Sequence, residues 1–131
     1  MRAITAIVIL GLVACATDSL SYSDRWTQLE KEGHRLTSTA EGQAWESSIL
    51  PVHNSFWPQV YEACSGQAKL SLIQKFGAIA VISDTGKIIE FLVMPKNAQT
   101  ECFSKQMVGR IYPAPPSSPY YEVYTINLVS E

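Results

Sequence analysis

The stretch from Phe76 to Pro95 constrains the fold of this chain more than any other. It reads FGAIAVISDTGKIIEFLVMP, in which two apolar runs rich in β-branched residues flank a polar segment at 83–87. Asp84 and Thr85 suit the two right-handed positions of a type I turn, and Gly86 can adopt the positive φ that lets the chain rejoin the ladder through a bulge. The stretch therefore predicts a β-hairpin.

The turn also predicts the register of the hairpin. Pairing Ser83 with Lys87 decides which residues of the two strands share a face. The expected core face carries Val81 opposite Ile89 and Ile79 opposite Phe91. The opposite face is also mostly apolar, and its residues are Ala78, Ala80, Ile82, Ile88 and Leu92. Because a two-stranded ribbon alone is marginally stable, the rest of the chain should supply a third strand and helices.

The C-terminal part of the chain supplies one helix and the third strand. Asn97 can cap a helix over Ala98 to Ile111. The proline-rich segment from Tyr112 to Pro119 cannot be helix or interior strand and predicts a stiff extended connector. Tyr120 to Val129 then alternates apolar and polar side chains, which predicts the third strand.

Capping and helical spacing predict three helices before the hairpin. The first covers Asp24 to Glu32 and stops near Gly33. The second begins with a capping-box pattern at Ser38 and ends at Pro51, and the third covers 55–64. Residues 68–74 fit either a turn of helix or a short extra strand, and the sequence leaves both open.

Together these elements predict an α+β fold with a three-stranded antiparallel sheet and helices on one face. At 131 residues, of which 47% are hydrophobic, the chain is long enough for one domain with its own core. The formal net charge of −2 argues against a nucleic acid or an anionic membrane surface as a partner recognised by charge.

The first 16 residues predict export. A single positive charge at Arg2 precedes a short apolar run, which is the form of a secretory signal. Leu12 to Cys15 resembles the bacterial lipobox, in which the signal is cut before a cysteine that becomes lipidated. A cut after Ala16 by the Ala-x-Ala rule is the alternative. The expected organisation is a signal at 1–16, a tether and N-terminal helices at 17–54, and an α+β domain at 55–131.

The cysteine count predicts one disulfide bond. Cys15 is either lipidated or removed, so Cys64 and Cys102 remain in the mature chain. An even pair in an oxidising compartment should be bridged. In the chain-entropy account, closing a loop of this length stabilises the fold by roughly 4 kcal/mol.

The segment from about Trp57 to Val129 resembles the TonB C-terminal domain and its disulfide-bearing relatives in bacterial envelope proteins. Four features carry the resemblance: a helix with Cys64, a hairpin with Asp84-Thr85-Gly86-Lys87 at its turn, a helix with Cys102 followed by Tyr112-Pro113-Ala114-Pro115-Pro116, and a terminal strand. The chain departs from energy-transducing TonB proteins, which have an uncleaved anchor containing a histidine and a long proline-rich spacer. The resemblance implies that a partner peptide can add to an unpaired edge strand, and it does not imply transmission of proton-motive force.

No motif for catalysis or metal binding stands out in the sequence. His34, His53 and the two remaining cysteines form no close ligand pair, so no metal or other cofactor is expected. There is no Gly-x-Ser-x-Gly elbow and no phosphate loop. The carboxylates of the helices, Glu41, Glu46 and Glu62, are spaced as solvated surface groups.

The sequence therefore predicts a non-catalytic binding or assembly module of the bacterial envelope, and a small periplasmic enzyme is the alternative. The lipid on Cys15 would anchor it in the outer membrane, since Ala16 rather than Asp follows the cysteine. The expected partner is an envelope protein or a second copy of this chain. The candidate binding residues are Ala78, Ala80, Ile82, Ile88, Leu92, Tyr121 and Val123. The alternative reading of this apolar face is that the N-terminal helices, with Trp26 and Trp45, cover it.

Overall fold

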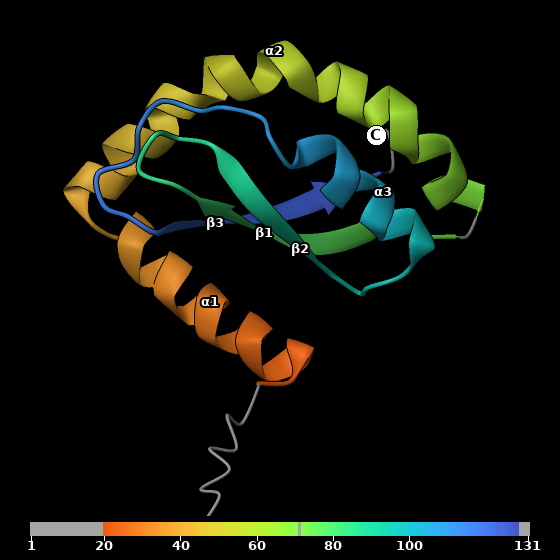
Figure 1. The fold of residues 1–131 in the computed structure, drawn as a ribbon. Coiled ribbons are helices and arrows are strands. Elements are labelled where there is room, and N and C mark those ends of the chain that lie inside the picture. Colours follow the sequence, from red (N-terminus) through yellow and green to blue (C-terminus); the bar gives the residue numbers. More distant parts are fainter. Residues whose placement is uncertain (1–19, 71, 129–131) are drawn as a thin grey trace, which may run out of the picture.

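The computed structural model describes residues 20–70 and 72–128, which form an α+β fold (Figure 1). The described elements in chain order are α1 (Tyr22–Thr37), α2 (Ala40–Leu70), β1 (Lys75–Ile82), β2 (Ile88–Met94), α3 (Ala98–Met107) and β3 (Tyr120–Asn127). The strands form an antiparallel sheet in the order β2-β1-β3, so β1 is central. The predicted fold class, the three-stranded sheet and the third strand are confirmed.

The hairpin turn between β1 and β2 forms at the predicted residues. The Ser83 amide donates to the Lys87 carbonyl at 2.9 Å, and Gly86 has a φ of 88°. A side chain at Gly86 would also collide with the connector, because a Cβ there would lie 2.0 Å from the Tyr112 carbonyl oxygen. Glycine is therefore required by both the backbone conformation and the close approach.

The predicted register is wrong beyond the first pair of the ladder. Ile82 pairs with Ile88, but the next pair is Val81 with Glu90, so Ile89 is the extra residue of a β-bulge. The segment after α3 pairs with this point from the outer side: the Ile88 amide donates to Arg110, and the Ile88 carbonyl accepts from Gly109. Because side chains alternate with a period of two, one extra residue exchanges the faces of every later residue in β2.

The sheet buries both of its faces, and helices therefore lie on two sides rather than one (Figure 1). Helices α2 and α3 cover one face, and α1 covers the other. The residues of the expected core separate: Ile79 and Val81 pack under α1, Phe91 faces α2 and α3, and Ile89 is 54% exposed. Trp26 of α1 and Trp45 of α2 belong to the two different cores, so N-terminal helices do cover the second face.

Helix α2 replaces two predicted helices. Pro51 and Pro58 both lie inside it, where each lacks the N–H that the carbonyl four residues earlier would accept. Those carbonyls belong to Ser47 and Asn54, which are exposed, so water can donate to them. The helix arches over the sheet (Figure 1), and it runs without a break through the domain boundary expected at 54–55.

The two remaining helices differ from expectation at their ends. Helix α1 continues through Gly33, because this glycine packs against β3: a Cβ there would lie 2.8 Å from Cγ2 of Val123. Asn97 caps α3 as predicted, accepting from the Thr100 amide at 3.0 Å. The helix ends at Met107, earlier than predicted, since the chain turns there to pair with the start of β2.

The predicted disulfide joins α2 to α3. Cys64 and Cys102 are bonded, with their Cα atoms 5.7 Å apart. The bond fixes α3 beneath the C-terminal half of α2, where Phe103 and Met107 are fully buried. Among the helices of the described residues, none is long and apolar enough to cross a membrane.

Candidate functional site

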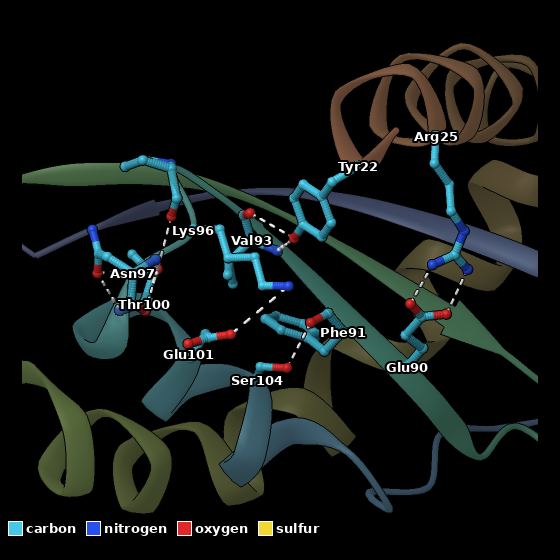
Figure 2. Close-up of polar contacts among 11 residues, drawn as sticks. Tyr22, Arg25, Glu90, Phe91, Val93, Lys96, Asn97, Thr100, Glu101 and Ser104 are labelled. Carbon is cyan, nitrogen blue, oxygen red and sulfur yellow. Dashed lines mark hydrogen bonds and ion pairs between the residues drawn. The ribbon is translucent and has the colours of Figure 1, made fainter. Parts of the chain in front are cut away.

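The outer edge of β2 is closed by side chains of α1 and α3 (Figure 2). The hydroxyl of Tyr22 accepts from the Val93 amide at 2.8 Å and donates to the Val93 carbonyl at 2.7 Å. Ser104 of α3 donates to the Phe91 carbonyl at 2.6 Å. These backbone groups point away from the sheet, so an added strand could not pair with them without displacing the side chains.

Charged groups reinforce this closed edge (Figure 2). The two terminal guanidinium nitrogens of Arg25, Nη1 and Nη2, donate to the two carboxylate oxygens of Glu90. The Lys96 ammonium lies 3.9 Å from Glu101 and 4.6 Å from the centre of the Tyr22 ring. The edge of β2 is thus covered by hydrogen bonds, ion pairs and a cation over an aromatic ring.

The outer edge of β3 is different. Since Val93 of β2 points its backbone groups outward, its ladder partner Ala78 points toward β3 and pairs there with Tyr124. The backbone groups of Val123 and Thr125 therefore point away from β1. Within residues 20–70 and 72–128, nothing hydrogen-bonds to the outward groups of these two residues. Part of the edge of β3 is open.

Among the described residues, two hollows that share His53 and Tyr124 lie beside β3. The larger, of about 470 Å³, lies between α2 and β3 and is lined by Gln43, Glu46, Ser47, Ile49, Leu50, His53, Glu122 and Tyr124. The smaller, of about 170 Å³, is lined by His53, Trp57, Phe91, Met107, Tyr124, Thr125, Ile126 and Asn127. His53 and Tyr124 belong to both, so the two hollows meet along the strand. We call the larger one the carboxyl hollow.

The carboxyl hollow contains a buried carboxyl group. Glu122 is 6% exposed, and its Oε2 atom has no hydrogen-bond partner among the described residues. Burial, then a hydrogen bond that the protonated Glu122 donates to Glu46, and then the charge of Glu46 together raise the pKa of Glu122 to about 9. Glu122 is therefore protonated at neutral pH.

A second orphaned polar atom lies beside this pair. The hydroxyl of Tyr120 is buried without a hydrogen-bond partner among the described residues. Burial, and then the carboxyl groups of Glu122 and Glu46, raise the pKa of Tyr120 to about 12. Gly42 leaves room for the hydroxyl, since a Cβ there would lie 2.9 Å from it.

A chain of polar aromatic groups borders the hollow. Nδ1 of His53 lies 2.7 Å from the Tyr112 hydroxyl, which lies 2.9 Å from the Tyr124 hydroxyl. Burial lowers the pKa of His53 and raises that of Tyr112 to about 12. The ring of His53 stacks on Trp57, with centroids 5.2 Å apart. The imidazole is thus held neutral and in one orientation.

The structure places the sequence-predicted binding residues under the helices. Ala78, Ala80, Ile82 and Ile88 are fully buried beneath α2 and α3, and Leu92, Tyr121 and Val123 pack against α1. These residues therefore belong to the core and not to an exposed surface, because helices cover both faces of the sheet. What stays open is the backbone edge at Val123. Cys15 lies outside the described residues.

The two histidines do not share a site with the cysteines. His34 is exposed on α1, His53 lies at the hollow, and Cys64 and Cys102 are bonded to each other. Across the described part of the chain, no three His, Cys, Asp or Glu side chains gather in a way that could hold a metal ion.

Sequence reasoning missed the buried carboxyl group. Glu46 was expected to be a solvated helix residue, whereas it forms a pair with Glu122. A signal for this existed: the alternation of the third strand puts Tyr124 and Ile126 on its inner face, and Glu122 lies on the same face. A carboxyl group at an inward position is the feature that indicates a site.

Comparisons of the chain with protein-family models, with curated proteins and with solved structures each return no match. The resemblance to the TonB C-terminal domain thus stays a prediction from sequence.

Proposed function

We propose that this protein is an envelope lipoprotein whose described domain binds an extended segment of a partner protein at the outer edge of β3. The observation that carries the proposal is the open backbone edge at Val123 and Thr125, next to the carboxyl hollow. A strand with unpaired amides and carbonyls is a template for another strand.

The contrast between the two edges indicates where on the sheet a partner strand would bind. Tyr22 and Ser104 cover the edge of β2, whereas at β3 the Tyr121 carbonyl is closely approached by Gly33 of α1. A partner strand would therefore add beyond Tyr121, where Thr125 and Asn127 are exposed. Its alternate side chains would face α2 and enter the hollows, which gives the interaction its specificity.

The compartment part of the proposal rests on the sequence. The apolar run at 3–14 and the lipobox pattern at Leu12 to Cys15 support export and a lipid on Cys15, facing the periplasm from the outer membrane. The disulfide between Cys64 and Cys102 agrees with an oxidising compartment. The intact mass of the mature chain tests this, since a protein that begins at Thr17 without added acyl mass would contradict it.

A proline on the edge tests the binding site. Thr125→Pro removes an outward N–H, which an edge strand tolerates, while Thr125→Val keeps the N–H and serves as the matched control. The wild type and both variants, full length and with the disulfide intact, are used to select peptides from a displayed library of random octapeptides. We expect peptides that bind the wild type and the valine variant, fail on the proline variant, and slow amide exchange at Val123 and Thr125. Peptides that bind all three equally would contradict the proposal.

One observation favours a second function, catalysis in the carboxyl hollow. A protonated Glu122 beside Glu46, with His53 on the same wall, resembles the pairing of a general acid with a second carboxyl group. Turnover of ester, glycoside or peptide substrates that disappears in Glu122→Gln but survives in Thr125→Pro would favour the enzyme over the binding module.

A further inference from the structure

We propose that the carboxyl hollow binds the basic side chain, arginine or lysine, of the segment that adds to β3, with Glu122 and Glu46 as its partners. This inference rests on the proposed function, and it names the chemistry of the bound segment.

The first argument is the unpartnered oxygen. Glu122 lines the hollow, is buried, and leaves Oε2 without a donor among the described residues. A buried acceptor without a donor is costly, so a ligand that brings a donor gains the free energy that this atom now loses. The described residues that line the hollow include no lysine or arginine.

The second argument is charge. Two carboxyl groups share the site, and their mutual repulsion is one of the causes that raise the pKa of Glu122. A cation between Glu46 and Glu122 would donate to both and offset the repulsion that ionisation of Glu122 creates, whereas a neutral donor would satisfy the oxygen but offset no charge. The site therefore favours a cation over an uncharged side chain.

The third argument is the shape of the wall. Ile49 and Leu50 present apolar surface, and Leu50 is 57% exposed although it lies beside the hollow. The methylene stem of a long basic side chain can cover such a surface while its charged end reaches the carboxyl groups. The rings of Tyr124 and His53 line the same hollow and stack on each other with their centroids 5.9 Å apart, so the wall is aromatic as well as aliphatic.

The proton balance of the binding step follows. The carboxylic acid of Glu122 gives its proton to the buffer when the cation binds, so the complex contains a carboxylate and an unchanged ammonium or guanidinium group. Binding should then strengthen as the pH rises from 6 to 8, below the pKa of about 9. The other titratable groups that face Glu122 are Glu46 and His53 on α2, Tyr112 on the connector, and Tyr120 and Tyr124 of β3.

The octapeptide selection on the full-length protein tests the inference separately from the proposed function. Among peptides that fail on Thr125→Pro, we expect arginine or lysine to be enriched at one position. Replacing that residue by norleucine should weaken binding by roughly tenfold to a hundredfold. Glu122→Gln and Glu46→Gln should abolish the difference between the two peptides, and Glu62→Gln, on an exposed part of the same helix, should keep it.

The ionisation of the Glu122 carboxyl group can also be measured directly. The carboxyl ¹³C signal of Glu122, titrated with and without the basic peptide, should show a lower pKa in the complex. Peptides that need the open edge but show no basic preference, and do not move this titration, would overturn the inference and leave the proposed function standing. An absence of edge-dependent peptides would overturn both.

Discussion

The two edges of the sheet differ in how their polar groups are paired. At β2, Tyr22, Ser104 and Arg25 pair with backbone or side-chain groups of the strand (Figure 2). At β3, outward backbone groups have no partner among the described residues, and the nearby carboxyl group of Glu122 has an orphaned oxygen. One edge has its polar groups paired within the fold, and the other has unpaired groups that the proposed partner segment would pair.

This difference predicts that substitutions at the two edges have opposite effects on the stability of the fold. Removing a polar group from the β2 edge leaves its partner unpaired and should destabilise the fold. Removing the ionisable group from the β3 side should stabilise the fold or leave it unchanged, while it weakens binding. Functional sites are the usual place for such local conflicts with stability.

The largest expected effect comes from the disulfide that fixes α3, and thereby Ser104, against the sheet. Replacing both Cys64 and Cys102 by alanine opens a loop that the bond closes across 38 residues of sequence separation. We expect the free energy of unfolding in urea to fall by about 4 kcal/mol. Amide exchange at Val93 should accelerate more than exchange at Val123, and equal changes at both residues would contradict a special link between the bond and the β2 edge.

The second largest effect concerns pH and the β3 side. The pKa of Glu122 is raised to about 9 in the folded chain, so between about pH 4.5 and 9 the unfolded chain is ionised while the folded one holds its proton. Stability should therefore fall as the pH rises, by roughly 2–3 kcal/mol between pH 6 and 8. Glu122→Gln should flatten this dependence and be the more stable protein at pH 8. Urea unfolding at several pH values measures it, and Glu62→Gln should retain the wild-type slope.

The third largest effect concerns the hydrogen bonds by which Tyr22 covers the β2 edge. Tyr22→Phe keeps the ring but removes the hydroxyl that serves both backbone groups of Val93. We expect a loss of about 1–3 kcal/mol in the free energy of unfolding, because two backbone groups lose their partner. Hydrogen exchange at the Val93 amide should accelerate. Tyr121→Phe, on β3, is the matched control, and an equal loss there would remove the contrast between the edges.

The sequence predicts the parts of the fold that depend on neighbouring residues. The turn at Gly86, the cap at Asn97 and the alternation of the third strand each need only a few consecutive side chains, and all three are confirmed. The bond between Cys64 and Cys102 was predicted because two cysteines remain once Cys15 is set aside.

The parts that sequence could not give depend on distant contacts. The bulge at Ile89 lies where Gly109 and Arg110 pair with the start of β2. No local sequence pattern predicts this pairing. Pro51 is accepted inside α2 because the carbonyl that it leaves unpaired faces water, and this exposure is a property of the packed fold. The carboxyl pair requires a helix and a strand that meet only in three dimensions.

The smallest expected effect comes from the ion pair between Arg25 and Glu90, although it is the most conspicuous contact in Figure 2. The two side chains are 40% and 42% exposed, so water screens the attraction, and exposed pairs typically contribute less than about 1 kcal/mol. A double-mutant cycle with Arg25→Met and Glu90→Gln should give a coupling energy of that size, which 1 M NaCl reduces. The loss in Tyr22→Phe should not respond to salt in this way. A coupling larger than the Tyr22 effect would mean that charge, rather than backbone hydrogen bonding, closes the β2 edge.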